Sequence, residues 1–201
     1  MKKELDYFYI DGKYGWNQED FKNLWMNKGG CACVTACESF VYMRKYLGKD
    51  KLYPYDIENV NSLDYVDFSN DVKPYLRPRW TGIDRLEIYV DGISDFLEDI
   101  DEHSISLSEF SGDNDIEDAV KIVKSQIDKK MLIPMLVLMH KNPKFKDFVW
   151  HWFLLTGYEE DGEKFMVKVV SYGSYRWFDF KELWNTGYKR KGGLILFNEN
   201  K

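Results

Sequence analysis

Three cysteines and one histidine are the residues of this chain whose types best suit covalent chemistry. Cys31, Cys33 and Cys37 lie within seven residues, and His151 lies in the apolar run VWHWFLLTGY. A thiol attacks acyl carbons as its thiolate, and an imidazole is a common acceptor of the thiol proton. A Cys–His pair that is distant in sequence and joined by the fold would therefore indicate nucleophilic attack on an acyl carbon.

The cysteine cluster has three interpretations. A zinc site needs about four ligands, but only Cys33 and Cys37 share a helix face and no fourth ligand lies nearby, so we predict no metal site. Small buried thiols in a core helix fit Cys37 and also Cys33. Cys31 follows Gly29-Gly30 at a predicted helix start, where free N–H groups and a partial positive charge are expected to lower the pKa of a thiol.

The three histidines differ in their surroundings. His103 lies in an acidic, polar stretch and is expected to be exposed, and His140 follows an apolar strand and is expected at the surface. His151 lies in a segment that is apolar on both faces, which predicts a buried central strand. A buried ring must be hydrogen-bonded, so His151 is either a satisfied core residue or the base that activates a thiol.

Hydrophobic periodicity predicts the elements that position these residues. The helix that starts at Cys31 is expected to end at Gly48, and the last quarter of the chain is expected to be rich in strands. We predict residues 50–82 to be irregular, with short helical pieces. The other predicted helices cover 19–26, 93–100, 115–130 and 180–184, and the predicted strands cover 86–90, 105–110, 132–139, 149–158, 164–170, 175–178 and 193–197.

A hairpin between the strands 149–158 and 164–170 gives His151 a predicted partner. If the chain turns near Asp161, His151 faces residues 170–172, and directly opposite side chains lie about 5 Å apart. Ser171 falls in this window. Its hydroxyl can accept a hydrogen bond from one ring nitrogen, which would leave the other nitrogen for a thiol.

At these residues the chain resembles the papain-like cysteine peptidases, and within them the bacterial peptidase C39-like group. The resemblance rests on Gln18, on Gly30-Cys31 opening a long helix, and on a strand that reads His151-x-x-x-x-Thr-Gly-Tyr. It covers residues 15–48 and 130–198. It implies an α+β papain-like fold, in which a buried N-terminal helix carrying the cysteine packs on a C-terminal antiparallel sheet carrying the histidine.

The resemblance also implies roles for single residues. Cys31 would be the nucleophile, His151 the base and then the acid, and Gln18 an oxyanion donor beside the backbone N–H of Cys31. Two positions depart from the family pattern. Ala32 follows the cysteine where most members have glycine, and the stretch 169–173 has no Asn or Asp to orient the histidine, so Ser171 would have to do so.

Length, composition and charge bound the remaining possibilities. The chain has 201 residues, 44% of them hydrophobic and 17% aromatic, which predicts one domain over 1–201 with a ring-rich core. A net charge of −6 argues against a nucleic-acid partner. We see no signal peptide and no membrane-spanning run, so we expect a cytoplasmic protein without a membrane partner. Residues 50–130 match no known pattern and are expected to be a variable region that builds much of the substrate cleft.

The sequence therefore supports two functional hypotheses. The first is a cysteine peptidase or amidase-like hydrolase that acts on a peptide or small amide substrate and needs no cofactor. The second is a catalytically inactive papain-fold protein that binds a partner, with Cys31 and His151 as core residues. The sequence does not separate a hydrolase from an acyltransferase, identify the substrate, or give the oligomeric state.

Overall fold

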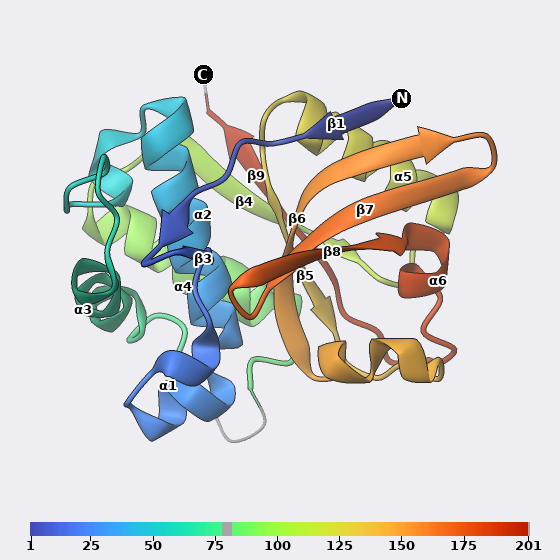
Figure 1. Ribbon diagram of the computed structural model, residues 1–201, viewed down its shortest axis with the longest axis horizontal. Helices are drawn as coiled ribbons and strands as arrows, with labels where there is room; N and C mark the ends of the chain where they lie inside the picture. The colour runs from blue at the N-terminus through green and yellow to red at the C-terminus, as the bar shows by residue number, and fades with distance from the viewer. Residues whose placement is uncertain (78–81, 201) are drawn as a thin grey trace.

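A seven-stranded antiparallel sheet forms the frame of the molecule (Figure 1). The computed structural model describes residues 1–77 and 82–200. The strand order is β4-β9-β5-β6-β7-β8, and β1 pairs with β6 off this path. The strands of this sheet are β1 (Lys2–Glu4), β4 (Ile105–Ser111), β5 (Ile133–Val137), β6 (His151–Asp161), β7 (Lys164–Ser171), β8 (Ser174–Asp179) and β9 (Gly193–Glu199). The α+β class expected from the sequence is confirmed.

Helices pack against both ends of this sheet. In Figure 1, α2, α3 and α4 stand on the left and α5 and α6 on the right. α2 packs against β6 and α3, α4 against β4 and β9, and α5 against β6 and β1. The helices are η1 (Gln18–Asp20), α1 (Leu24–Gly29), α2 (Cys31–Leu47), η2 (Asp50–Leu52), α3 (Ser62–Val72), α4 (Leu86–Asp99), α5 (Ile116–Asp128), η3 (Pro143–Phe148) and α6 (Phe180–Trp184), and β2 (Tyr9–Ile10) and β3 (Lys13–Tyr14) form a separate hairpin.

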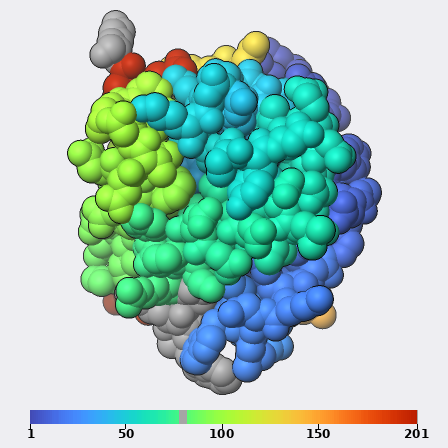
Figure 2. All heavy atoms as spheres, turned by 90° about the vertical axis from the view of Figure 1, so that its left-hand side faces the viewer, coloured from blue at the N-terminus to red at the C-terminus, as the bar shows by residue number. Residues whose placement is uncertain are grey.

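α2 is the central helix, and its bounds agree with the sequence prediction. It begins at Cys31 and ends at Leu47, where Gly48 adopts the left-handed conformation that commonly terminates helices. All residues from Cys31 to Met43 are buried, so α2 must be covered on several sides. β6 covers one side and α3 another. Figure 2 shows the outer face of this covering, where residues of α3 and α4, in teal and green, form one continuous surface.

The middle region is more helical than the sequence suggested. The predicted strand at 86–90 is wrong, because Leu86 begins the 14-residue helix α4. The buried positions Leu86, Tyr89, Ile93 and Phe96 recur every three to four residues, as one face of a helix requires. The stretch 50–82, predicted as irregular with short helical pieces, contains η2 and the 11-residue helix α3, and its residues 78–81 lie outside the described part of the chain.

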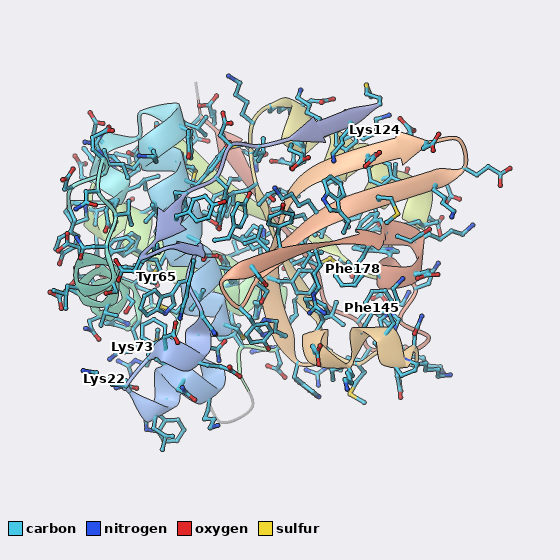
Figure 3. The ribbon with its side chains drawn as sticks, in the orientation of Figure 1. Lys22, Tyr65, Lys73, Lys124, Phe145 and Phe178 are labelled. Carbon is cyan, nitrogen blue, oxygen red and sulfur yellow. The ribbon has the colours of Figure 1, made fainter. Side chains whose placement is uncertain are left out.

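Aromatic rings dominate the core, as the composition predicted. Trp152 of β6 stacks on Tyr89 of α4 with ring centroids 4.7 Å apart, and its indole N–H donates to the Ile83 carbonyl at 2.7 Å. Phe145 of η3 and Phe178 of β8, both labelled in Figure 3, have ring centroids 5.4 Å apart. The first pair joins β6 to α4, and the second joins η3 to β8.

The N-terminal strand β1 was not predicted. It pairs with residues 157–159 of β6, and a Cβ added at Gly157 would lie 2.8 Å from the backbone oxygen of Lys3. Glycine is therefore needed there for β1 to approach. Beside it, the buried ammonium of Lys168 donates to both Glu4 and the Tyr14 hydroxyl, each at 2.8 Å. Two N-terminal segments are thus attached to β7.

No helix in the described ranges is both long and apolar enough to span a lipid bilayer.

Candidate active site

Cys31 occupies the first position of α2. The chain passes from α1 to α2 through Gly30, whose N–H donates to the Met26 carbonyl at 3.0 Å. A Cβ at Gly30 would lie 2.4 Å from that same oxygen, so the tight junction excludes any larger residue. The sequence pair Gly30-Cys31 is thus a packing requirement that places the thiol at the N-terminal end of a buried helix.

His151 is the first residue of β6, opposite Val137 of β5. The ring is buried, and its Nε2 lies 2.8 Å from the hydroxyl oxygen of Ser171. The β6–β7 ladder lies two to three residues from the predicted register, with a bulge between Leu155 and Gly157. The expected His151–Ser171 contact is nevertheless present, because Ser171 ends β7 and its side chain reaches back to the ring. Ser171 therefore contacts one ring nitrogen of His151, Nε2, and not the other, Nδ1.

One narrow pocket brings the predicted site residues together. Gln18, Cys31, His151 and Ser171 all line it, although they come from four different segments of the chain. The space open to water in it is about 10 Å³, enough for about one water molecule. The other lining residues are Trp16, Val34, Trp152, Phe153, Val170 and Tyr172. Of the described residues, none from 50–130 lines this pocket, which differs from the expectation that this region builds the cleft.

Gln18 contributes an amide to the pocket from η1. Its Nε2 donates to the Asn27 carbonyl at 2.9 Å, which fixes which end of the amide is the nitrogen. The side chain is 9% exposed, and its Oε1 is buried without a partner in the described structure. Because an amide nitrogen carries two hydrogens, one N–H stays available for a further acceptor, as an oxyanion donor requires.

The titration of the pair departs from the sequence expectation. Burial raises the pKa of the Cys31 thiol to about 11, and the N–H groups of Trp152, Ala32 and Cys31 itself counter it only in part. Burial also lowers the pKa of His151 to about 4. The predicted lowering of the thiol pKa by the helix start is therefore wrong for the closed pocket, because desolvation outweighs the N–H groups. At neutral pH both groups are uncharged.

Tyr172 is a pocket residue that sequence analysis missed. Its ring stacks on that of His151, with centroids 4.6 Å apart and an interplanar angle of 5°. Tyr172 and Gly173 form the two-residue turn between β7 and β8, and both have positive φ, 53° and 67°. Such turns favour Asn-Gly, so tyrosine in this conformation is unusual. The signal in the sequence was a short strand followed directly by Tyr-Gly.

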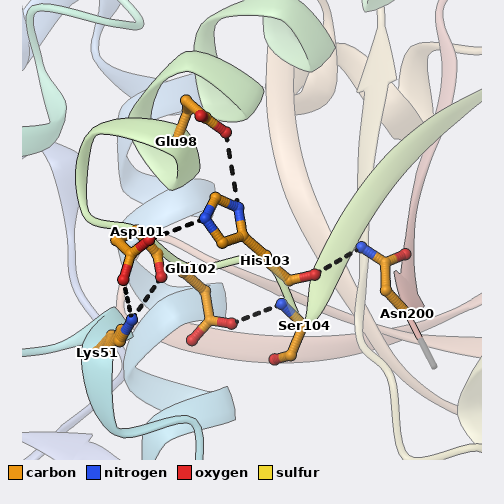
Figure 4. A network of polar contacts seen from close by, with 7 residues as sticks. All are labelled: Lys51, Glu98, Asp101, Glu102, His103, Ser104 and Asn200. Carbon is orange, nitrogen blue, oxygen red and sulfur yellow. Dashed lines mark hydrogen bonds and ion pairs between the residues drawn. The ribbon is translucent and has the colours of Figure 1, made fainter.

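The remaining cysteines and histidines lie outside this pocket. Cys33 and Cys37 are buried, with their sulfurs 3.9 Å apart, and the described residues contain no His/Cys/Asp/Glu group that could hold a metal ion. His103 is exposed and contacts Asp101 and Glu98 at the surface (Figure 4), as expected. His140 is partly exposed and hydrogen-bonds the Glu182 carbonyl at 3.0 Å.

Comparisons with known proteins give a fold and no family. No protein-family model matches the sequence, and no curated protein matches it. Among solved structures, the chain is similar to the crystal structure of UfSP from C. elegans, with a TM-score of 0.51 and 10% sequence identity. The match covers 98% of this chain and 33% of that chain, so this chain spans about one third of its length. At this identity the likeness supports a papain-like cysteine peptidase fold and nothing about activity.

Proposed function

We propose that this protein is a thiol hydrolase of the cysteine peptidase or amidase type, with Cys31 as its nucleophile. The observation that supports it best is the convergence of Cys31, His151, Gln18 and Ser171 on one pocket, with His151 Nε2 bonded to Ser171. A histidine that is oriented on one nitrogen and lines the same pocket as a thiol fits the arrangement of a nucleophile and its base. The papain-like fold agrees with this assignment.

The proposed reaction has two halves. In the first, the Cys31 thiol gives its proton to Nδ1 of His151 while the sulfur attacks the carbonyl carbon of an amide. The resulting oxyanion accepts hydrogen bonds from the Cys31 backbone N–H and from Gln18 Nε2. His151 then gives the proton to the departing amine, and the acyl group stays on the sulfur.

In the second half, His151 takes a proton from water, and the hydroxide attacks the thioester carbon. The carboxylic acid leaves and the proton returns to the sulfur. An amine or alcohol in place of water would make the same site an acyltransferase. The proposed substrate is a peptide or a small amide, as expected from the sequence.

A catalytically inactive papain-fold binding protein is the second candidate. The burial of the pocket and the uncharged state of Cys31 and His151 favour it, because a structural thiol and a satisfied core histidine have these properties. The two candidates differ in one respect. Only the enzyme needs Cys31 to react faster than the two buried cysteines of the same helix.

Alkylation with iodoacetamide followed by peptide mass spectrometry separates the two candidates. We expect Cys31 to be labelled at least about tenfold faster than Cys33 and Cys37, because Cys31, unlike the other two, lines the pocket that holds His151. His151→Ala should slow the labelling of Cys31 and leave the other two thiols unchanged. Cys31→Ala serves as the blank for slow background reaction.

A second measurement tests the acyl intermediate. Incubation with p-nitrophenyl acetate should release a burst of p-nitrophenolate and leave an acetyl group on Cys31, which mass spectrometry locates. Slow and equal labelling of all three thiols, with no acetyl group on Cys31, would reject the enzyme and favour the binding protein.

Two finer assignments also remain proposals. A relationship to the bacterial C39-like peptidases rests on the Gln18, Gly30-Cys31 and His151 to Tyr158 pattern alone. A cytoplasmic location rests on the three free, clustered thiols, which a reducing compartment would preserve.

A further inference from the structure

Glu38 is a buried carboxyl in the middle of α2 that the proposed mechanism does not use. It is 2% exposed and lies seven residues after Cys31, so the two side chains share one face of the helix, two turns apart. Within the described residues no cation pairs with it; the titratable groups near its carboxyl are Tyr7, Tyr65 and the Cys37 thiol. A carboxyl without a cation is costly to bury, which calls for a specific partner.

That partner is the backbone of Trp16. The Trp16 N–H donates to Glu38 Oε1 at 2.5 Å. The residue before Trp16 must be glycine, because a Cβ at Gly15 would lie 2.3 Å from Glu38 Oε1. Gly15 also has a φ of 76°, which favours glycine. The carboxyl of Glu38 and the bend at Gly15 are thus fitted to each other.

The other side of Trp16 is attached to the turn beside His151. The Trp16 carbonyl accepts from the Gly173 N–H at 3.0 Å, and the Tyr14 N–H donates to the Gly173 carbonyl at 3.1 Å. Gly173 belongs to the turn that carries Tyr172, directly after Ser171. Gln18, the proposed oxyanion donor, follows Trp16 by two residues in the sequence.

We propose that Glu38 is a positioning residue of the active site, whose carboxyl holds the Trp16 backbone so that Gln18 and the Ser171–Tyr172 turn keep their places relative to Cys31. The inference rests on the proposed function. Glu38 acts through Trp16 and touches no substrate. It joins the helix that carries the nucleophile to the two segments that carry the oxyanion donor and the support of the base.

The protonation of Glu38 determines which substitution preserves this contact. Burial raises the pKa of Glu38 to about 8, although the Trp16 N–H and the Tyr7 phenol oppose the shift. Near pH 7 the side chain is therefore mainly a neutral acid, and glutamine has nearly the same shape with an oxygen that accepts from Trp16. Leucine has similar bulk but accepts nothing.

Two substitutions and a matched control test the proposal. The rate of Cys31 acetylation by p-nitrophenyl acetate and the hydrogen exchange of the Trp16 and Gly173 amides are measured at pH 7 for Glu38→Gln, Glu38→Leu and Ser39→Ala. Ser39 is the adjacent buried residue, and its hydroxyl donates to the Thr35 carbonyl of the same helix. Circular dichroism checks that each variant is folded.

We expect Glu38→Leu to slow acetylation at least about tenfold and to speed exchange of both amides, because one oriented oxyanion donor is commonly worth more than that in rate. Glu38→Gln and Ser39→Ala should stay within about twofold of the wild type. A folded Glu38→Leu variant that acetylates as fast as the wild type would overturn the inference alone. A wild-type protein that is never acetylated would overturn the proposed function, and the inference with it.

Discussion

Cys31 and His151 form an uncharged pair at neutral pH, because burial raises the pKa of the thiol to about 11 and lowers that of the imidazole to about 4. A preformed thiolate–imidazolium pair would need the opposite order of pKa values. In the proposed mechanism the thiolate therefore forms during the attack, as His151 takes the proton. The pH dependence of reactivity distinguishes these two cases.

We expect the rate of Cys31 alkylation to rise continuously from pH 7 to pH 10, by up to about tenfold per unit, because the thiolate fraction grows in that proportion below the thiol pKa. A preformed ion pair would instead give a rate that is already level at pH 7. Mass spectrometry of the Cys31 peptide over this pH range measures the profile, with His151→Ala as the control for the contribution of the base.

Ser171 should contribute modestly to turnover. Its hydroxyl makes one neutral hydrogen bond to His151, and such a bond is worth about 1 kcal/mol, or about fivefold in rate. We expect Ser171→Ala to lower the acetylation rate by about that factor, whereas Cys31→Ala should abolish it. Ser174→Ala is a suitable control, because that hydroxyl bonds the Ser171 backbone carbonyl and not the ring. Unchanged turnover in Ser171→Ala would remove its orienting role.

For single residues, the sequence predicted the contact between His151 and Ser171 better than it predicted the pKa of Cys31. The hairpin between β6 and β7 brought Ser171 to His151 even though the assumed register differed from the observed one by two to three residues. Tyr172 was missed because two-residue turns with positive φ favour Asn-Gly, so the Tyr-Gly pair after the strand is a weak signal. The pKa of Cys31 was misjudged because a helix start can be recognised in a sequence, while the depth of its burial cannot.

The junction of α1 and α2 is the element on which the position of Cys31 depends. A Cβ at Gly30 would meet the Met26 carbonyl oxygen at 2.4 Å, and this atom belongs to backbone that cannot move without displacing α1. Gly48 at the other end of α2 is different, since nothing lies within 4 Å of its Cβ position.

We therefore expect Gly30→Ala to lower the free energy of unfolding by about 2 kcal/mol or more and to slow alkylation of Cys31. Gly48→Ala should cost only about 1 kcal/mol, because alanine is strained at its φ of 67°, and should leave Cys31 reactivity unchanged. Urea denaturation and alkylation of the two variants test the pair. Equal effects on reactivity would show that the junction does not position the thiol.

Helices and strands with a clear apolar period were predicted almost to the residue, as α2, α6 and β7 show. The failure at α4 has a physical cause. Leu86 to Val90 alternates like a strand over five residues, and the glycine at position 92 looks like a break. Gly92 instead lies inside the helix. It must be glycine because a Cβ there would come within 2.3 Å of the Tyr75 carbonyl oxygen. Only the tertiary neighbour explains this glycine.

For the whole molecule, Glu38 and His151 give the stability an unusual dependence on pH. A carboxyl with a raised native pKa keeps its proton longer in the folded state, so Glu38 makes stability fall as pH rises from about 4.5 to about 8. His151, with its lowered native pKa, makes stability rise between about 4 and 6.5. The two slopes oppose each other below pH 6.5, and only that of Glu38 remains above it.

We expect the free energy of unfolding to decrease between pH 6.5 and pH 8, by up to about 1.4 kcal/mol per unit. Glu38→Gln should remove this decrease, because glutamine does not titrate. Urea denaturation at several pH values measures both curves. A wild-type curve that is flat over this range would show that Glu38 is already ionised in the folded protein.

The strand segment Thr156-Gly157-Tyr158 is part of the sequence pattern on which the resemblance to peptidases rests. Gly157 admits β1, Tyr158 is a buried ring whose hydroxyl reaches Asp128 at 3.1 Å, and the Thr156 carbonyl accepts the Leu5 N–H at 2.8 Å. The contact of Thr156 is made by its backbone, so it does not require threonine, whereas Gly157 and Tyr158 are required by the packing of their neighbours. A match at these two positions therefore reports how the segments dock and carries no information about chemistry.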